Sequence, residues 1–191
     1  MARNRSQQNI IPLEECKKFV EKWKKNPLSK PRIEKVVVNI CVGTSGEPLE
    51  RAMKILEQLT GQKPVKLLAK KTIKGFGIHR GEPIACKVTL RKKRGEDFLR
   101  KVLPAVQHQL KFDSFSVNTF SFGIDEHLKI PGTRYDPELG IFGMDICVSL
   151  ERPGFRIARR KRCKSKIPSK VRISPLEAAC YMMHEFNVQI I

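Results

Sequence analysis

The chain has 191 residues, and its 38 lysines and arginines outnumber its 19 aspartates and glutamates, giving a formal net charge of +19 and a pI near 10.0. Such an excess is extreme for a soluble enzyme and ordinary for a nucleic-acid-binding protein. No apolar run approaches the about 18 residues that a membrane-spanning helix needs, and the first residues lack the apolar region of a signal peptide. We expect a soluble, cytoplasmic protein with one domain over residues 1–191.

The basic excess is unevenly distributed. Residues 62–101 hold 13 basic and 3 acidic residues, and residues 152–172 hold 10 basic residues and no acidic one. Residues 102–151 hold 3 basic and 7 acidic residues. This pattern predicts two surfaces for an anionic partner and one region that faces something else.

Residues 13–23 predict a short amphipathic helix that ends at Asn26-Pro27. A helix docked on the core, with its basic side in solvent, explains the pattern better than a specific binding role. Its apolar positions, at helical spacing, are Leu13, Cys16, Val20 and Trp23.

Residues 36–42 alternate as a strand. One face holds Val36, Val38, Ile40 and Val42, and the other holds Val37, Asn39 and Cys41. Asparagine is disfavoured in mid-strand, which indicates that its face is not the core face.

A glycine-containing turn at 43–46 leads into a helix with Pro48 in its first turn and Gly61 as its C-terminal cap. The turn could hold a phosphate at the helix N-terminus. Glu47 and Glu50, in that first turn, argue against an anion there.

Residues 62–83 are basic and rich in glycine. Because Phe76 stands between two glycines, we expect this ring at the tip of a mobile loop, where it could stack on an unpaired base. The alternative is a Phe76 ring that folds back into the core.

Residues 84–91 are the clearest strand in the sequence, with Ile84, Cys86, Val88 and Leu90 facing the core. The opposite face carries Lys87, Thr89 and Arg91, and neither this face nor that of Asn39 carries an aromatic residue. The two strands therefore predict a sheet with helices on one side and an open cationic surface that reads a folded RNA through phosphates and 2′-hydroxyls.

The C-terminal half predicts a helix from Glu96 with a kink at Pro104, and alternating strands over 120–124 and 144–150. A capping box at Ser174 and Glu177 begins the closing helix.

Between the last strand and that helix lies the basic segment, residues 152–172. Its ten basic residues repel one another, so it is not expected to order without a polyanion such as RNA. The apolar residues Phe155, Ile157, Ile167 and Val171 suggest a loop that packs when bound. A disordered solubilising loop and a nuclear or membrane-surface signal are the alternatives.

Motifs for catalysis, metals and cofactors are absent from the sequence. The six cysteines have no zinc-ligand spacing. Four of them fall at or beside apolar positions, where a free thiol behaves as a small apolar residue, which fits a reducing compartment. The four histidines are scattered, and His127 beside Asp125 and Glu126 is expected to be structural rather than an acid/base group of an RNA-cleaving site. We therefore predict no enzyme activity, no metal and no cofactor.

Several motifs occur in an order that resembles the universal large-subunit ribosomal protein five family, in its archaeal form, whose eukaryotic relative is called protein eleven. The resemblance implies an α+β fold with an antiparallel sheet, helices on one face and an open RNA-binding face. It also implies a structural protein that binds 5S rRNA and helps to attach it in the central protuberance of the large ribosomal subunit. The motifs lie at residues 35–43, 56–64, 84–91, 122–127, 135–137 and 152–155.

Motif matching assigns the 5S rRNA surface to Asn39, Gln62, Lys63, Thr89, Leu90 and Arg91. The loop from Lys74 to Arg80 corresponds to one that reaches the P-site tRNA, with contacts expected from Lys74, Phe76, Gly77, His79 and Arg80. The basic stretches add further expected rRNA contacts at Lys70, Lys71, Arg94, Arg152, Arg159, Arg160, Lys161 and Arg162.

The implied partners are 5S rRNA, large-subunit rRNA, P-site tRNA, neighbouring proteins of the central protuberance and a small-subunit head protein across a subunit bridge. The acidic region 102–151 is expected to face the proteins. The competing hypotheses are an RNA-processing enzyme and a free tRNA-binding factor.

Overall fold

The structure is a computed structural model that describes residues 13–191. The predicted single domain starts at residue 1, so its first twelve residues lie outside the described part. Within that part, none of the helices is both long enough and apolar enough to cross a membrane.

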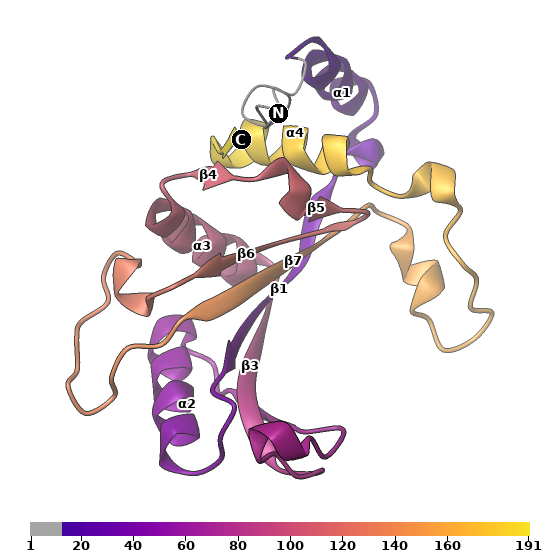
Figure 1. Ribbon diagram of the computed structural model, residues 1–191. Coiled ribbons are helices and arrows are strands. Elements are labelled where there is room, and N and C mark those ends of the chain that lie inside the picture. Colours follow the sequence, from indigo (N-terminus) through magenta and orange to yellow (C-terminus); the bar gives the residue numbers. More distant parts are fainter. Residues whose placement is uncertain (1–12) are drawn as a thin grey trace, which may run out of the picture. The chain divides into compact units, whose positions relative to one another are not determined.

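Figure 1 shows the helices and strands. The helices are α1 (Leu13–Lys25), α2 (Glu47–Thr60), α3 (Lys93–Val102) and α4 (Pro175–Phe186). The strands are β1 (Arg32–Cys41), β2 (Val65–Leu68), β3 (Pro83–Arg91), β4 (Gln109–Leu110), β5 (Phe115–Ser116), β6 (Thr119–Ile124), β7 (Met144–Glu151) and β8 (Gln189–Ile190).

Six strands form one sheet in the order β2-β3-β1-β7-β6-β5. Strand β3 pairs antiparallel with both β1 and β2, and β5 pairs antiparallel with β6. The predicted α+β class with an antiparallel sheet is confirmed. The short parallel pair formed by β4 and β8 was not predicted.

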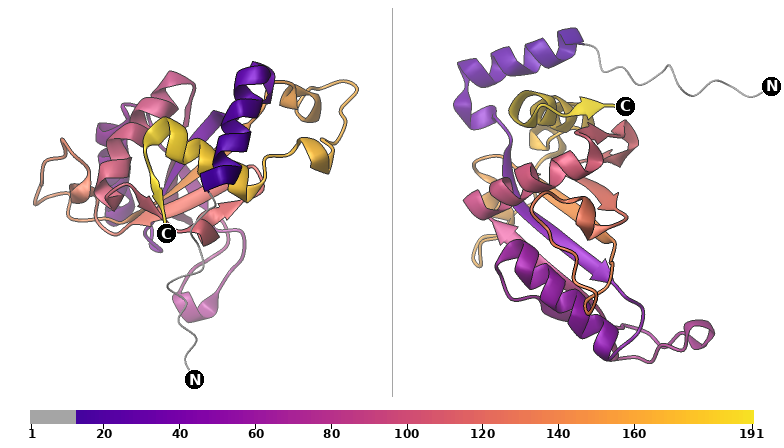
Figure 2. Two further views of the ribbon diagram at one scale, coloured as in Figure 1. Left: turned by 90° about the horizontal axis from the view of Figure 1, so that it is seen from above. Right: turned by 90° about the vertical axis from the view of Figure 1, so that its left-hand side faces the viewer.

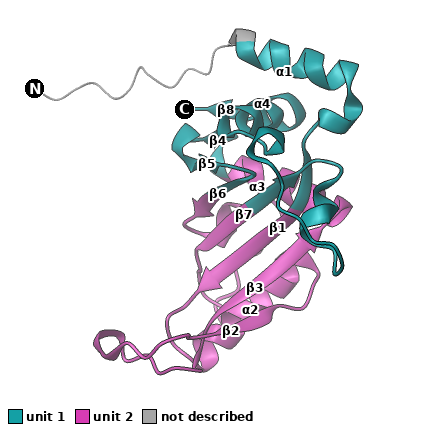
Figure 3. Ribbon diagram, turned by 90° about the vertical axis from the view of Figure 1, so that its right-hand side faces the viewer, with its two compact units in different colours: residues 1–34, 106–121, 148–191 teal, residues 35–105, 122–147 magenta. Residues whose placement is uncertain are grey.

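The chain divides into two compact units (Figure 3). The described residues of unit 1 are 13–34, 106–121 and 148–191, and those of unit 2 are 35–105 and 122–147. The single domain, with loops 70–83 and 152–172 as its extensions, stays a prediction.

Unit 2 has a core between strands and helices. The predicted alternation is confirmed for Val36, Val38 and Ile40 of β1 and for Cys86, Val88 and Leu90 of β3, which are all buried. It is wrong at the start of β3, where Ile84 is only half-buried and Ala85, predicted on the opposite face, is buried. Helices α2 and α3 both contact β3 (Figure 2). They contribute the buried residues Leu49, Ala52, Ile55, Leu56, Phe98, Leu99 and Val102.

Helix α2 begins and ends as predicted. Pro48 lies in its first turn, and Gly61 caps its end with a φ of 62°, a left-handed conformation that glycine adopts without strain.

Helix α3 begins at Lys93, three residues before the predicted start at Glu96. A Cβ at Gly95 would lie 3.4 Å from both the carbonyl oxygen of Leu90 and a methyl group of Val36. Glycine therefore lets the first turn approach both strands. The predicted kink does not form, because the α-helix ends at Val102 and Pro104 lies in the 3₁₀ turn that follows.

Strand β2 lies in residues 62–83, just before the predicted loop 70–83, and no strand was predicted there. The strand has four residues, and its pairing with β3 is interrupted by a register shift at Leu67 and Leu68. So short a strand, with most of its residues exposed, lacks the alternation on which the other strands were predicted.

In unit 1, helix α4 contributes the buried apolar residues Ala178, Ala179, Cys180, Tyr181, Met182 and Phe186. The Ser174 hydroxyl accepts a hydrogen bond from the Glu177 amide at 3.2 Å, which confirms the predicted cap. The Glu177 carboxylate instead binds Arg152 and the Trp23 indole. The capping box is therefore formed in one direction only.

The expectation of free thiols is wrong for Cys16 and Cys180, which form a disulfide between α1 and α4. Their Cα atoms are 5.3 Å apart, within the range that a disulfide bridges. The two residues are 164 positions apart in sequence, so only the packing of the helices reveals the pair. Cys41, Cys86, Cys147 and Cys163 are free.

Candidate nucleic-acid interface

The open face of unit 2 is the side of β1 and β3 that points away from the buried apolar residues. Its residues pair directly across the two strands as Lys35 with Arg91, Val37 with Thr89, and Asn39 with Lys87. Arg91 is exposed and the other five are half-buried, so the predicted face is accessible within unit 2.

Three cations share this face with two hydrogen-bonding side chains. Lys35 and Arg91 stand opposite each other, where side chains are close enough for like charges to repel. A phosphate between them would convert that repulsion into attraction. Asn39 and Thr89 add groups that can donate to phosphate or sugar oxygens. Lys35 and Lys87 were not assigned as contacts, although Lys87 already stood on the predicted polar face.

Gln62 is held at the edge of this face by the end of α2. Its amide nitrogen donates to the carbonyl oxygen of Thr89 at 3.3 Å, and Thr60 contacts its backbone. Lys63 follows directly and is exposed. The structure therefore brings Gln62 next to Thr89, as the assignment of both to one surface requires.

Leu90 lies elsewhere. Its side chain is 1% exposed and belongs to the core of unit 2. It points away from the open face, because successive residues of a strand point to opposite faces. Arg94, at the start of α3, is exposed.

The glycine-rich loop, residues 70–83, is an ordered turn that projects beyond β2 and β3 (Figures 1 and 2). Ile73 and Ile78 pair as an isolated bridge, and Lys74–Phe76 form a 3₁₀ turn that Gly77 closes at a φ of 66°. Phe76 is 78% exposed, which confirms its predicted place at the tip and excludes the core alternative.

Glu82 fixes the conformation of that loop. Its carboxylate accepts hydrogen bonds from the His79 amide at 3.0 Å and from the Ser45 hydroxyl at 2.7 Å. These bonds, with the His79 amide as the larger cause, lower the pKa of Glu82. The Arg80 amide donates to the Thr72 hydroxyl at 3.0 Å. The loop exposes the predicted contacts Lys70, Lys71, Lys74, His79 and Arg80.

The basic segment, residues 152–172, lies in unit 1 and is partly neutralised by acids from elsewhere in that unit. Arg152 is 8% exposed and pairs with Glu177, and Arg159 pairs with Glu34 and Glu151. The prediction that the segment lacks counterions is therefore wrong for these two arginines. Arg160, Lys161 and Arg162 are exposed as predicted.

His127 has a structural role in the described fold. It is 4% exposed, its amide donates to the carbonyl oxygen of Phe142 at 3.0 Å, and its Nδ1 accepts from the Phe142 amide at 3.3 Å. Nearby, Asp125 pairs with Lys129. No cluster of three or more potential metal ligands occurs among residues 13–191.

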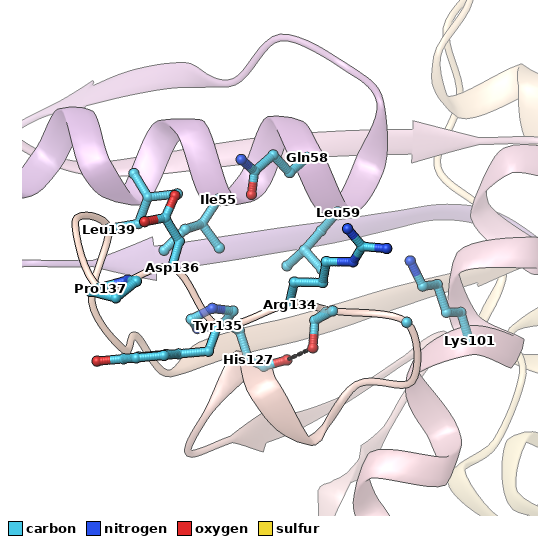
Figure 4. Close-up of a pocket in the computed structure, with 12 residues that line it drawn as sticks. Ile55, Gln58, Leu59, Lys101, His127, Arg134, Tyr135, Asp136, Pro137 and Leu139 are labelled. Atoms are coloured by element: carbon cyan, nitrogen blue, oxygen red, sulfur yellow. Dashed lines mark hydrogen bonds between the residues drawn. The ribbon is translucent and has the colours of Figure 1, made fainter.

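A cavity of about 460 Å³ in unit 2 lies beside His127 (Figure 4). Helix α2 lines it with Ile55, Gln58 and Leu59, and the loop over residues 132–139 lines much of the rest. The His127 carbonyl oxygen accepts from the Thr133 hydroxyl at 3.4 Å, so the histidine shapes the loop that walls the cavity.

Comparison with known proteins identifies the family. Residues 26–79 match the family model of ribosomal protein L5, and residues 83–171 match the model of the C-terminus of the same ribosomal family. The chain belongs to the ribosomal protein L5 family. The two matches together span the open face and most of both the glycine-rich loop and the basic segment.

Similar chains are the large ribosomal subunit proteins uL5 of three archaea. The protein of Sulfurisphaera tokodaii is 55% identical over 87% of this chain and 95% of its own length. That of Sulfolobus acidocaldarius is 49% identical over 90% of this chain and 97% of its own. That of Aeropyrum pernix is 45% identical over 95% of each.

Membership confirms the resemblance from which the sequence was interpreted. It makes the protein a structural ribosomal protein of the cytoplasm rather than an enzyme, as predicted. The residues that touch RNA are a separate matter, and their assignment stays a prediction.

Proposed function

We propose that the protein binds 5S rRNA through the open face of unit 2 and helps to attach it in the central protuberance of the large ribosomal subunit. The observation that carries this proposal is the uncovered row of Lys35, Lys87 and Arg91 with Asn39 and Thr89 between them. The apolar side of the same strands holds the row rigid, so little order has to be gained on binding.

The chemistry of this face favours a folded RNA over splayed single-stranded bases. None of its six residues is aromatic, so it offers no stacking platform. Cations and short polar side chains suit phosphates and 2′-hydroxyls presented by a helix.

Salt dependence tests RNA binding directly. If roughly 8 phosphates are neutralised, the logarithm of the affinity for 5S rRNA should fall against the logarithm of salt concentration with a slope of about −6 to −7. Filter binding with purified protein measures it. A nearly flat response would argue for a protein partner instead.

A footprint on isolated 5S rRNA locates the contact. Lys87→Ala should remove part of the protection, whereas Lys54→Ala, which removes an exposed cation of α2, should leave it intact. Equal loss in both variants would contradict the assignment to the open face.

We further propose that the glycine-rich loop contacts the P-site tRNA. Phe76 is exposed at an ordered tip that also carries Lys74, His79 and Arg80, which combines a stacking surface with cations. Deleting residues 75–77 should alter tRNA retention and spare 5S rRNA binding. Equal loss of both would reject this division of roles.

The family resemblance implies the remaining partners, and the charge distribution suggests which region faces each. The basic segment would bind large-subunit rRNA, and the acidic region 102–151 would face neighbouring proteins of the central protuberance and a small-subunit head protein across a subunit bridge. Cross-linking of intact ribosomes followed by mass spectrometry tests the protein contacts. Cross-links from this region to RNA alone would overturn them.

The exposed Phe76 would also suit a free tRNA-binding factor. Sucrose-gradient fractionation separates the two functions. A stoichiometric component stays with the large subunit through a high-salt wash, whereas a free factor, like an RNA-processing enzyme, is released.

A further inference from the structure

The two ends of the basic segment are joined by one buried side chain. Arg152 begins the segment, and its Nη1 donates to the carbonyl oxygen of Val171, near the other end, at 2.8 Å. Its Nη2 donates to both carboxylate oxygens of Glu177 on α4. Arg152 therefore closes a loop of about 20 residues and fastens its base to a helix.

Glu177 is itself fixed. It is 3% exposed, and one of its oxygens also accepts from the Trp23 indole at 3.3 Å. Separating a buried ion pair leaves an unpaired charge away from water, which is costly. The positive charge of Arg152 is therefore neutralised by Glu177 inside the protein.

Arg159 forms a second anchor within the segment. Its guanidinium pairs with Glu34 and Glu151. Glu151 is also bound by Arg32 at 2.7 Å, and Glu34 accepts from the Ser149 hydroxyl at 3.0 Å. The network ties the first third of the segment to β1 and β7 within unit 1.

A third anchor holds the exit of the segment. The Asn118 side-chain oxygen accepts from the Ile173 amide at 2.7 Å, and the Asn118 amide donates to the Ile173 carbonyl oxygen at 3.1 Å. Ile173 is fully buried. Both ends of the segment are thus fixed by contacts that involve no RNA.

The tip, residues 160–166, differs from the base. The Arg160 side chain donates a hydrogen bond to the Cys163 carbonyl oxygen, and the Ser165 amide donates one to the Ile157 carbonyl oxygen at 3.3 Å. The tip is therefore a closed turn. Within residues 13–191, no acid forms an ion pair with its five cations. These exposed cations are Arg160, Lys161, Arg162, Lys164 and Lys166.

We propose that the basic segment is a preformed RNA-binding loop in which Arg152 and Arg159 position the loop and the tip, residues 160–166, makes the RNA contacts. The proposal rests on the proposed binding of rRNA and refines it, because it removes two arginines from the contact set and adds Lys164 and Lys166. A loop that is ordered before binding loses less conformational freedom when RNA binds.

A substitution that removes a negative charge separates this proposal from a purely electrostatic one. Glu177→Gln makes the protein more basic, so charge alone predicts tighter RNA binding. If Glu177 acts by holding Arg152, the substitution frees the two ends of the loop from α4, and the affinity for RNA falls instead. Glu185→Gln is the matched control, because it removes an acid of the same helix that pairs with Lys30 outside the segment.

The experiment is filter binding of the full chain to protein-free large-subunit rRNA over a series of NaCl concentrations. Glu177→Gln and Arg152→Lys should each lower the affinity by about three- to tenfold, because the loop must then be ordered on binding. The slope against salt should stay unchanged in both. Glu185→Gln should bind at least as tightly as the unaltered chain.

The tip variants report the contacts themselves. Lys161→Ala and Arg162→Ala should each reduce the magnitude of the salt slope by about 0.7 to 0.9, the value of one phosphate contact. Trypsin should cleave the tip faster in Glu177→Gln and Arg152→Lys than in Glu185→Gln, with thermal melting confirming that all three fold.

Two results overturn the proposal. One is a Glu177→Gln variant that binds as tightly as Glu185→Gln. The other is an Arg152→Lys variant that binds as tightly as the unaltered chain, because lysine would keep a direct phosphate contact but not the paired hydrogen bonds to Glu177. Should one of these variants not fold, the other still decides. If the tip variants change neither affinity nor slope, the segment does not bind rRNA, and the proposed function of the segment fails rather than its positioning.

Discussion

The open face of unit 2 and the basic segment of unit 1 are both cationic, but they hold their cations in place by different means. On the open face, Lys35, Lys87 and Arg91 are set by the pleat of two strands whose other side is buried. In the basic segment, order comes from arginines paired with Glu34, Glu151 and Glu177. A hydrophobic core maintains the first surface and charge pairing maintains the second, so different changes should damage them.

The largest expected effect is on the core beneath the open face. Leu90→Ala should lower the free energy of unfolding by about 2–5 kcal/mol, because it removes a buried side chain and leaves a cavity. Urea denaturation measures this loss. The same substitution should weaken 5S rRNA binding only indirectly, by distorting the strands.

Leu90→Ala also decides how this residue contributes to the site. If Leu90 acted as an RNA contact with no part in the core, stability would be unchanged while RNA affinity fell. Glu177→Gln provides the contrast in unit 1, since it should loosen a loop and leave the core of unit 2 as it is.

The next effect is on the affinity for 5S rRNA and not on the stability of the fold. Arg91→Ala should weaken 5S rRNA binding by about 1–3 kcal/mol, the value of a hydrogen bond to a charged group. Arg91 is exposed, so thermal stability should change little. Isothermal titration of the two proteins against 5S rRNA gives the difference.

Lys54→Ala is the control for Arg91→Ala, because it removes the same charge from the exposed side of α2. Comparable losses in the two variants would mean that net charge, rather than the open face, determines affinity.

A smaller effect is expected at the glycine-rich loop. Phe76→Ala should weaken tRNA retention on ribosomes by about 1 kcal/mol, the lower end of the value for stacking of one base on an aromatic ring. Because the ring is 78% exposed, neither folding nor 5S rRNA binding should respond. A filter assay of tRNA on purified ribosomes tests it, and unchanged retention would remove Phe76 from the contact set.

These differences explain how far the sequence alone could lead. The faces of strands β1 and β3 could be predicted, because burial of one face of a strand places an apolar residue at every second position. Gly61 and Ser174 were predicted as caps for a similar reason, since capping depends on residues within one turn. The rigid part of the open face is therefore encoded locally.

The basic segment was harder because its order depends on distant partners. Arg152 counted as one of ten repelling charges, and Glu177 was interpreted as part of a capping box. Their pairing across 25 positions appears only when β7 and α4 come together. The disulfide of Cys16 and Cys180 was missed for the same reason.

The smallest expected effect is a pH dependence at the loop of Phe76. Hydrogen bonds from the His79 amide and the Ser45 hydroxyl lower the pKa of Glu82. The ionised carboxylate therefore stabilises the loop at pH values above the pKa of a glutamate in the unfolded chain, about 4.3. This contribution is lost as the pH falls through the lower pKa of the folded state.

An NMR titration of the Glu82 carboxyl carbon should therefore have its midpoint below the ordinary pKa of a glutamate, and the His79 amide signal should shift with the same midpoint. Ser45→Ala removes the smaller of the two causes, so it should raise the midpoint only part of the way. A midpoint that Ser45→Ala leaves unchanged would show that Ser45 does not brace this loop. The glycine-rich loop combines both modes of support, because it emerges from the strands of the rigid face and yet depends on a carboxylate, as the basic segment does.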